Sequence, residues 1–405
     1  MAITTKQEGV WGIDQVYAKQ NQGSIWSYTY QQYLWAWGKN EFGELGLNDI
    51  AKRSSAVQVP GSNWAQVASG SASVSAIKQD GTLWSWGKNV VGTFGIPSYA
   101  DDAMLSSPVQ VGTDKSWTLV RKEGNINEQN CCAVRNDKTL HSWGSNEYGQ
   151  LGHNDRNNRD SPVKIPGTWS DGDYHLAVYG LNTLAIKPDG TMWIWGYNNQ
   201  GKLGLNQSPT GYWWSPNRKD RSSPTQLTSS SDWKSCALGS SNGLALKTNG
   251  TLWSWGEATY GDHGHNDRIS RSSPTQIGTD TDWDVVMSTG YSTYQTAAIK
   301  TNGTLWTWGE NTQGQLGQND VIHQSSPVQI PGTTWSHVMP AGYSCMAYKT
   351  DGTLWSWGYN NHGNLGHNDR ITRSSPTQVV GDWDTLQFTK SATIRYGFLV
   401  ITEEP

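Results

Sequence analysis

The sequence predicts an all-β protein, a seven-bladed β-propeller of about 53-residue repeats that is closed by pairing of the N- and C-terminal strands. Three observations support this fold class. A Trp-x-Trp-Gly segment recurs along the chain, five of its copies follow an Asp-Gly or Asn-Gly tight-turn signal, and each chain end carries part of one repeat. The final glycines of the recurring segment are Gly38, Gly87, Gly144, Gly196, Gly256, Gly309 and Gly358. Seven copies of one unit favour a single radial domain.

The first half of each unit is predicted to be a β-hairpin. An Asp-Gly or Asn-Gly step separates two short apolar runs, as in residues 76–86. Asn and Asp tolerate a positive φ and Gly adopts it freely, so this step favours a tight turn. The residues around it alternate with period two, which is typical of strands. In the third copy, His141 stands where the first Trp is expected.

The second tryptophan of each Trp-x-Trp-Gly segment is predicted to be a structural core residue. In an extended strand both indoles of the segment point to one face. An indole can bury ~150–250 Å², so packing is a sufficient role for these side chains. The predicted structural residues are Trp37, Trp86, Trp143, Trp195, Trp255, Trp308 and Trp357.

The second half of each unit adds a glycine-rich turn and a proline-containing strand. A Gly-Gln-Leu-Gly-like turn (residues 149–152) is followed by a Ser-Ser-Pro element such as residues 106–108. Proline lacks the donor that a sheet needs, so this strand is short, lies at an edge or starts at the Pro. A Trp then opens the next unit, and each repeat is therefore several short antiparallel strands.

The two chain ends indicate a closed ring. The first hairpin arm, residues 34–38, lacks its preceding arm, and the last repeat, residues 383–401, lacks the arm that should follow. Joined together they make one whole unit, which removes exposed sheet edges. We therefore expect the propeller to span residues 34–401, with an N-terminal docking segment at 1–33 and a short tail at 402–405.

Composition limits the partners and the compartment. The formal net charge is −4, and neither sign forms a long run, so we predict no nucleic-acid surface. No transmembrane run and no cleavable leader occur, so we expect no membrane insertion and folding in a reducing cytoplasm. The four cysteines fall without metal-ligand spacing and are expected to be buried free thiols.

The repeat pattern resembles the regulator-of-chromosome-condensation repeat family. The similar residues are the x-Trp-Gly-x-Asn-x-x-Gly-Gln-Leu-Gly segments, the Trp64, Val67 and Gly70 spacing and the Asp-Gly turns. The resemblance covers about residues 34–401 and implies a seven-bladed propeller. It also implies, as an alternative function, guanine-nucleotide exchange on a small GTPase, although the loops that carry this activity in the family cannot be aligned here.

Residues 1–33 lie outside the repeat and carry a candidate anchor. Trp11, Ile13, Val16 and Tyr17 recur at roughly helical spacing, and Trp26 lies in an extended piece. These side chains either pack on the propeller itself or dock on another protein. The Val-Trp-Gly-Ile-Asp-Gln-Val-Tyr run resembles the opening of virion structural proteins of tailed bacteriophages. That resemblance implies a virion protein, made in the host cytoplasm, whose N-terminal segment contacts other virion proteins.

The insertion at residues 206–221 carries a candidate binding loop. Its adjacent aromatic side chains, Tyr212, Trp213 and Trp214, could stack on a sugar or anchor a contact with a host surface protein. Alternatively they cover an apolar gap between neighbouring blades. The first interpretation gives a lectin-like function as a second alternative.

No catalytic constellation is evident in the sequence. His-Asn-Asp recurs at residues 153–155, 265–267 and 367–369, but each copy lies in a separate repeat and is expected to close a turn. We therefore predict no catalytic residue, no cofactor-binding residue and no metal ligand. The leading hypothesis is a non-enzymatic structural or binding module, an appendage or decoration protein of a bacteriophage virion.

Overall fold

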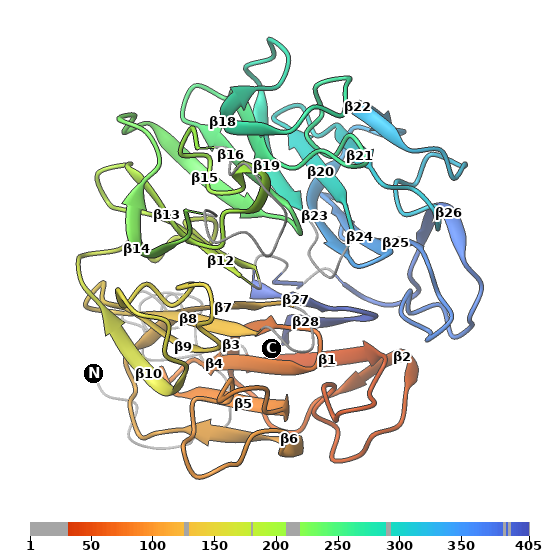
Figure 1. Cartoon of the computed structure of the whole chain (residues 1–405). Helices are drawn as coiled ribbons and strands as arrows, with labels where there is room; N and C mark the ends of the chain where they lie inside the picture. The colour runs from red at the N-terminus through yellow and green to blue at the C-terminus, as the bar shows by residue number, and fades with distance from the viewer. Residues whose placement is uncertain are drawn as a thin grey trace, which may run out of the picture.

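The computed structural model confirms the predicted fold class: seven four-stranded antiparallel sheets are arranged as blades around a central axis (Figure 1). It describes residues 31–124, 129–179, 181–207, 219–288, 293–383, 386–387 and 390–404. The helical content of these residues is one short 3₁₀ turn, η1 (Asn199–Gly201).

The blades follow one another along the chain, and each is given from its innermost to its outermost strand. They are β3 (Trp64–Ser69), β4 (Ser73–Lys78), β5 (Leu83–Lys88) and β6 (Met104–Val111); β7 (Trp117–Glu123), β8 (Asn130–Arg135), β9 (Leu140–Gly144) and β10 (Arg159–Ile165); β11 (Leu176–Tyr179), β12 (Asn182–Ile186), β13 (Met192–Gly196) and β14 (Arg221–Gln226); β15 (Trp233–Leu238), β16 (Asn242–Lys247), β17 (Leu252–Gly256) and β18 (Arg271–Gln276); β19 (Trp283–Ser288), β20 (Gln295–Lys300), β21 (Leu305–Gly309) and β22 (Gln324–Ile330); β23 (Trp335–Ala341), β24 (Ser344–Lys349), β25 (Leu354–Gly358) and β26 (Arg373–Gln378); and the closing blade, β27 (Ala392–Ile394), β28 (Gly397–Glu404), β1 (Gln31–Gly38) and β2 (Arg53–Gln58).

The ring closes through the two ends of the chain, as the sequence predicts. Strands β1 and β28 pair antiparallel over eight residues, from Gln31 opposite Glu404 to Gly38 opposite Gly397. Strand β1 therefore begins three residues before the predicted span 34–401, and β28 ends three residues after it. Since β1 and β28 come from opposite ends of the chain, the closing blade ties the first and last repeats together.

The Asp-Gly steps form hairpin turns, but only the glycine adopts a positive φ. In the turn between β4 and β5, Gly81 has a φ of 78°. The Asp80 carboxylate instead accepts hydrogen bonds from the backbone N–H and the hydroxyl of Thr82, at 3.1 and 2.7 Å. A Cβ on Gly81 would lie 2.1 Å from the carbonyl oxygen of Lys115 in the next blade. The turn thus requires glycine both for its conformation and for packing between blades.

The second tryptophan of each segment lies in the core and joins its blade to the preceding one. Trp86 is fully buried, and its indole N–H donates to the carbonyl of Glu44, 3.0 Å away in the loop after β1. Such a bond satisfies the buried N–H. The other six bonds run from Trp143 to Thr93, Trp195 to Gln150, Trp255 to Lys202, Trp308 to Asp262, Trp357 to Gln315 and, across the seam, Trp37 to Asn364, at 2.8–3.1 Å.

The proline-containing strands lie at the outer edge of each sheet, which was one of the predicted placements. These strands also accept a second kind of hydrogen bond between blades, from the backbone of an asparagine in the preceding blade. Asn48 has a φ of 62°, and its backbone N–H donates to the carbonyl of Ser106 at 2.7 Å. Five equivalent bonds run from Asn154 to Ser222, Asn206 to Ser272, Asn266 to Ser325, Asn319 to Ser374 and Asn368 to Ser54.

The hydrophobic core is divided into seven clusters that lie between neighbouring blades. One cluster joins Trp86, on β5, to Leu34 and Ile401 of the closing blade. A blade therefore buries its two faces only when it has a neighbour on each side. This explains why the sheet of one repeat needs the complete ring.

We predict that removing one interblade indole strongly destabilises the ring. Trp255→Ala should lower the free energy of unfolding by about 3–5 kcal/mol, because it leaves a cavity and removes the hydrogen bond to the Lys202 carbonyl. Trp255→Phe, which keeps most of the packing but loses the N–H, should cost about 1–3 kcal/mol. Urea unfolding followed by circular dichroism measures both values. The matched control is Trp253→Ala on the same strand, since Trp253 is only partly buried. An equal loss for Trp253→Ala and Trp255→Ala would contradict the interpretation.

Candidate functional site: the central channel and the two faces of the ring

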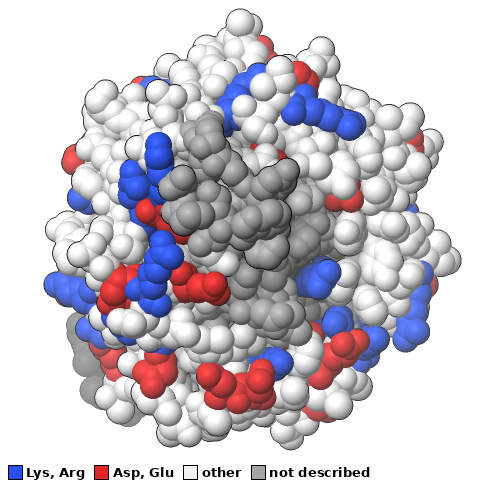
Figure 2. Space-filling view, in the orientation of Figure 1, with Lys and Arg blue, Asp and Glu red and all other residues white. Residues whose placement is uncertain are grey.

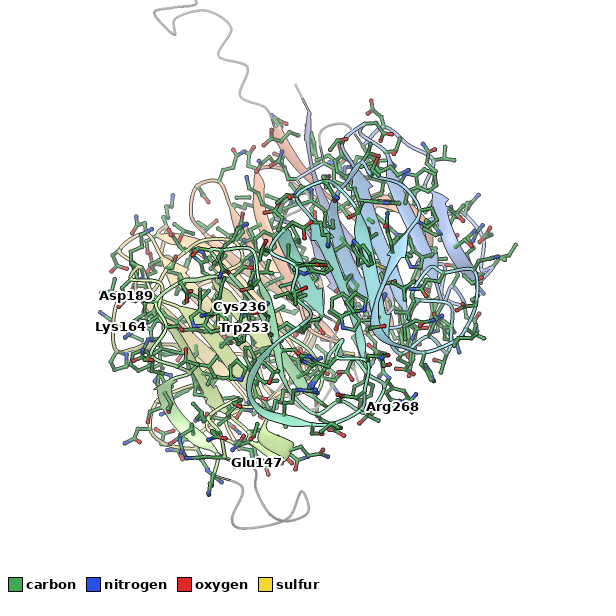
Figure 3. The ribbon with its side chains drawn as sticks, turned by 90° about the horizontal axis from the view of Figure 1, so that it is seen from above. Glu147, Lys164, Asp189, Cys236, Trp253 and Arg268 are labelled. Atoms are coloured by element: carbon green, nitrogen blue, oxygen red, sulfur yellow. The ribbon has the colours of Figure 1, made fainter. Side chains whose placement is uncertain are left out.

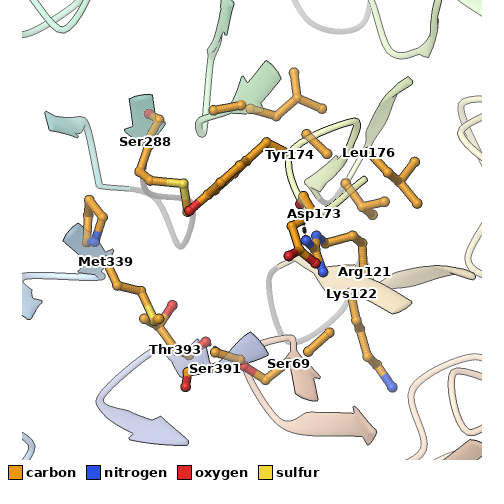
Figure 4. A pocket seen from close by; sticks show the side chains of 18 of the residues that line it. Ser69, Arg121, Lys122, Asp173, Tyr174, Leu176, Ser288, Met339, Ser391 and Thr393 are labelled. Carbon is orange, nitrogen blue, oxygen red and sulfur yellow. Dashed lines mark hydrogen bonds between the residues drawn. The ribbon is translucent and has the colours of Figure 1, made fainter. Parts of the chain in front are cut away.

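The innermost strands of the blades surround a central channel. A cavity of about 140 Å³ in this channel is lined by residues of β3, β7, β11, β15, β19, β23 and β27. Much of the wall is apolar or small, and the charged groups gather where β7 meets the loop before β11, as Figure 4 shows.

Arg121 and Asp173 form the charged part of the channel wall. One guanidinium nitrogen of Arg121 donates to the carbonyl of Val120 at 3.0 Å, and another donates to the carbonyl of Asp173. Burial lowers the pKa of Arg121, and nearby Asp173 opposes that effect. The guanidinium is thus held against the wall, with Asp173 beside it (Figure 4).

Gln66 connects this group to the neighbouring strands. Its side-chain oxygen accepts the backbone N–H of Val120 at 2.7 Å, and its amide nitrogen donates to the Asp173 carboxylate at 3.5 Å. Tyr174 follows in the same loop, and burial raises the pKa of its hydroxyl to about 12. The tyrosine is therefore neutral at physiological pH and presents an aromatic ring and a hydroxyl group to the channel.

The Cys236 thiol and the Lys122 ammonium, which lie near the channel, both donate hydrogen bonds within the structure. The Cys236 thiol donates to the carbonyl of Tyr174 at 3.5 Å, and burial raises its pKa to about 12, so it is not a thiolate nucleophile at neutral pH. Lys122 points away from the cavity (Figure 4). Its ammonium donates to the carbonyl of Thr93 at 3.0 Å and to the hydroxyl of Ser75 at 3.3 Å. All four cysteines are buried and free.

The recurring His-Asn-Asp residues form turns, as expected. His153 contacts the hydroxyl of Ser142 at 3.0 Å, and Asn154 has a φ of 61°. Asp155 pairs with Arg159 at 2.6 Å. The same histidine–serine contact recurs at His265 and His367. Within the described ranges, no group of three His, Cys, Asp or Glu side chains could hold a metal ion.

The two faces of the ring carry different connections between strands. We call the face with the Asp-Gly and Asn-Gly turns the hairpin face, and the face with the connections between third and fourth strands the loop face. The closing blade has no such hairpin, because β1 begins and β28 ends at that position. Residues 1–30 therefore join the propeller at the hairpin face. In Figure 3, Glu147 and Arg268 of the loop face lie below Asp189, which belongs to a hairpin turn.

The candidate binding loop joins the propeller on the opposite side. Gln207 and Lys219, the described residues nearest to the aromatic side chains, lie in the connection between β13 and β14. The turn between β12 and β13 lies at the other end of the blade. Tyr212, Trp213 and Trp214 themselves lie outside the described residues. The same holds for the candidate anchor residues Trp11, Ile13, Val16, Tyr17 and Trp26.

The channel group was missed in the sequence analysis. Arg121, Asp173 and Gln66 come from three different blades or their connections and share no motif. A weak signal existed, since Arg121 and Lys122 place two adjacent positive charges directly after the apolar pair Leu119 and Val120 in β7. On the face shown in Figure 2, basic and acidic side chains are interspersed. In the described part of the chain, no helix is long and apolar enough to cross a membrane.

The fold and its repeats define a class, a seven-bladed propeller made of Trp-Gly hairpins with a central channel. The model of the regulator of chromosome condensation (RCC1) repeat matches residues 33–77, 137–170, 189–246, 302–347 and 351–392, more than half of the chain. The chain belongs to this repeat family.

Relatives and solved structures agree with that assignment. The chain is 28% identical over 301 residues to the ultraviolet-B receptor UVR8 of Arabidopsis thaliana, and 26% identical over 310 residues to the E3 ubiquitin-protein ligase HERC2 of Homo sapiens. These matches cover 73% and 74% of this chain, but only 65% of the receptor and 6% of the ligase.

Two crystal structures share the fold at 17% identity. Yeast RCC1 (Prp20), solved with Kap60, gives a TM-score of 0.76 and covers 93% of this chain and 90% of that chain. Human WBSCR16 gives 0.75 and covers 93% of this chain and 100% of that chain.

We predict that Lys122 makes stability depend on pH. Burial lowers its pKa from 10.5 to about 8, so the unfolded chain binds this proton more tightly than the folded one. Below pH 8 the folded state therefore carries a penalty on the order of 3 kcal/mol, which disappears as the pH rises toward 10.5. In urea unfolding, Lys122→Met should therefore be more stable than the parent at pH 7. This difference in the free energy of unfolding should shrink by about 2 kcal/mol between pH 7 and pH 9.5. A constant difference across this range would contradict the prediction. Lys138→Met, at a surface ion pair, is the control.

Proposed function

We propose that this protein is a non-catalytic binding propeller that is anchored at its hairpin face and presents its loop face to a partner. The single observation that carries this proposal is the opposite placement of the two candidate segments. Residues 1–30 join the ring beside the pair Gln31 and Glu404, whereas the insertion at residues 206–221 joins it at the far ends of β13 and β14. One segment can therefore hold an assembly while the other contacts a second partner.

The architecture suits such a role because the two faces are connected by a closed and rigid ring. Each blade contacts the next through an indole bond, and six interfaces add the asparagine–serine bond. A load or a contact at one face is therefore transmitted through packed sheets. Binding residues are commonly carried by loops on a scaffold of this kind.

In its finer form, the proposal places the protein in the virion of a tailed bacteriophage, as an appendage or decoration protein. The support is the resemblance of the N-terminal residues, including Trp11 and Trp26, to the opening of virion structural proteins. The partners would be other virion proteins at the hairpin face and a host surface protein or glycan at the loop face.

Deleting residues 1–30 tests the anchoring role. The deletion ends before β1 begins at Gln31, so the ring should still fold, with a melting temperature within about 2 °C of the parent. The truncated protein should fail to co-sediment with particles when it is produced in cells that assemble them. The matched control is the full-length chain with the surface substitution Lys138→Met, which should co-sediment as the parent does. Normal incorporation of a folded truncated protein would refute the anchoring role.

The lectin-like alternative is favoured by the position of the insertion on the free loop face. A Trp213→Ala/Trp214→Ala double variant should lose at least tenfold in affinity for any glycan that an array identifies, because stacking on the sugar is removed. Its fold should be unchanged by circular dichroism. An array on which the parent binds nothing would count against this alternative.

The exchange-factor alternative rests on the fold. A crystal structure of Prp20p from Saccharomyces cerevisiae, described together with its binding to Gsp1p and histones, has a TM-score of 0.75 to this chain at 17% identity. Accelerated nucleotide release from a candidate GTPase would favour exchange over the virion role.

A further inference from the structure

A cation lies between two indoles in most blades of the ring. In the first complete blade, the ammonium of Lys78 is 4.7 Å from the ring centre of Trp64 and 4.5 Å from that of Trp84. Trp64 begins the innermost strand, and Trp84 is the first indole of the Trp-x-Trp-Gly segment. Equivalent pairs hold Lys187 (Trp169 and Trp193), Lys247 (Trp233 and Trp253), Lys300 (Trp283 and Trp306) and Lys349 (Trp335 and Trp355), at 3.9–5.3 Å.

The remaining complete blade keeps a cation although it has lost one indole. Arg135 lies over Trp117 at 4.6 Å, and His141 contacts the same indole ring from the position of the missing tryptophan. Burial lowers the pKa of His141 to about 4, and the charge of Arg135 acts in the same direction. Six blades thus supply their own cation at this point, and attraction to the indole faces favours it.

A carboxylate completes the site in two of the five lysine blades. Asp232, immediately before Trp233, pairs with Lys247 at 3.1 Å. Asp282, immediately before Trp283, pairs with Lys300 at 3.0 Å. Lys300 is partly buried, which opposes its charge, but the hydrogen bonds that its ammonium donates to Asp280 and Asp282 raise its pKa. In these two blades the site therefore consists of two aromatic faces and an acid placed for one ammonium group.

The closing blade keeps the indoles and the acid but has no lysine at the equivalent position. Its indoles are Trp383 and Trp35, and Asp382 precedes Trp383 as Asp232 precedes Trp233. In β28, Val400 pairs with Trp35, just as Ala76 pairs with Trp84 in the complete blade. Thr402 is therefore the residue that corresponds to Lys78. The indole N–H of Trp35 donates to its hydroxyl at 3.0 Å.

A cavity of about 650 Å³ lies at this point. Trp35, Trp383, Asp382 and Thr402 all line it, and Glu403 adds a second carboxylate. None of its described lining residues is a lysine or an arginine. Val380, whose side chain is 93% exposed, also lines the cavity, so an apolar surface extends from the site to the solvent.

We propose that this seam site binds a lysine side chain of a partner polypeptide. The five lysine copies show which chemistry the geometry accepts, an alkylammonium chain lying along two indoles. In two of them the charge also lies near a carboxylate. The exposed Val380 beside the cavity suits a ligand that continues as a polypeptide. This inference does not depend on the role of residues 1–30 or on the virion placement.

The first test uses the full chain and two small probes. Nα-acetyl-lysine N-methylamide should bind with a Kd on the order of millimolar. Saturation-transfer NMR measures this binding. Its neutral isostere, Nα-acetyl-norleucine N-methylamide, should bind at least tenfold more weakly. Added salt should weaken the binding of the lysine probe and leave the binding of the norleucine probe unchanged. Equal binding of the two probes, or no binding of either, would overturn the proposal.

Two variants locate the binding within the chain. Thr402→Lys should place a lysine of β28 at this site, abolish probe binding and raise the melting temperature by about 1–3 °C. Lys300→Thr should create a second open site, so that the probe binds with a stoichiometry of two and partly restores the lost stability. Unchanged probe binding by folded Thr402→Lys would refute the location. If Thr402→Lys does not fold, the stoichiometry of Lys300→Thr decides, and a value of one would refute the proposal.

A third arm identifies the source of the lysine. The chain without residues 1–30 should bind the probe as the parent does. If only the truncated chain binds the probe, the site is filled from within the protein, and the proposal of a partner lysine is wrong.

Discussion

The structure depends on one repeated interaction, the burial of an indole between two blades with its N–H bonded to a carbonyl of the preceding blade. The bond from Trp86 to Glu44 is typical, and the bond from Trp37 to Asn364 completes the circle. An indole N–H without a partner in this dry interface would be costly. Each blade therefore satisfies a group of its neighbour. The propeller is stable as a ring because no blade can bury its tryptophan alone.

A second set of buried polar groups fixes the loop face. The side-chain oxygen of Asn40 accepts the backbone N–H of Leu45 at 2.9 Å, while its amide nitrogen donates to the Asp49 carbonyl at 3.0 Å. The amide thus bridges the two ends of the loop between the third and fourth strands. Equivalent asparagines include Asn146, Asn311 and Asn360. Since these amides hold the two ends of each loop together, an insertion such as residues 206–221 can be accommodated without disturbing the sheets.

Function in such a ring is expected where the repeat is broken, because the repeated residues are already engaged with one another. The central channel differs from blade to blade, with Arg121 and Asp173 on one side only. The closing blade differs more, since two chain ends replace a hairpin and Thr402 replaces a cation. Both departures lie on an otherwise regular scaffold. The fold of the family is therefore compatible with several kinds of partner, and the departures decide which one is bound.

The sequence by itself determined the strands, the hairpins, the number of blades and the closure of the ring. These follow from period-two alternation, from turn chemistry and from incomplete repeats at both ends, which are properties of neighbouring residues. Only the tertiary structure decided that Asp80 bonds to Thr82 while Gly81 alone takes the positive φ. It also decided that Trp86 reaches a carbonyl 42 residues away, and that Thr402 stands at a cation position. These contacts are set by the packing of one blade against the next, which no local pattern specifies.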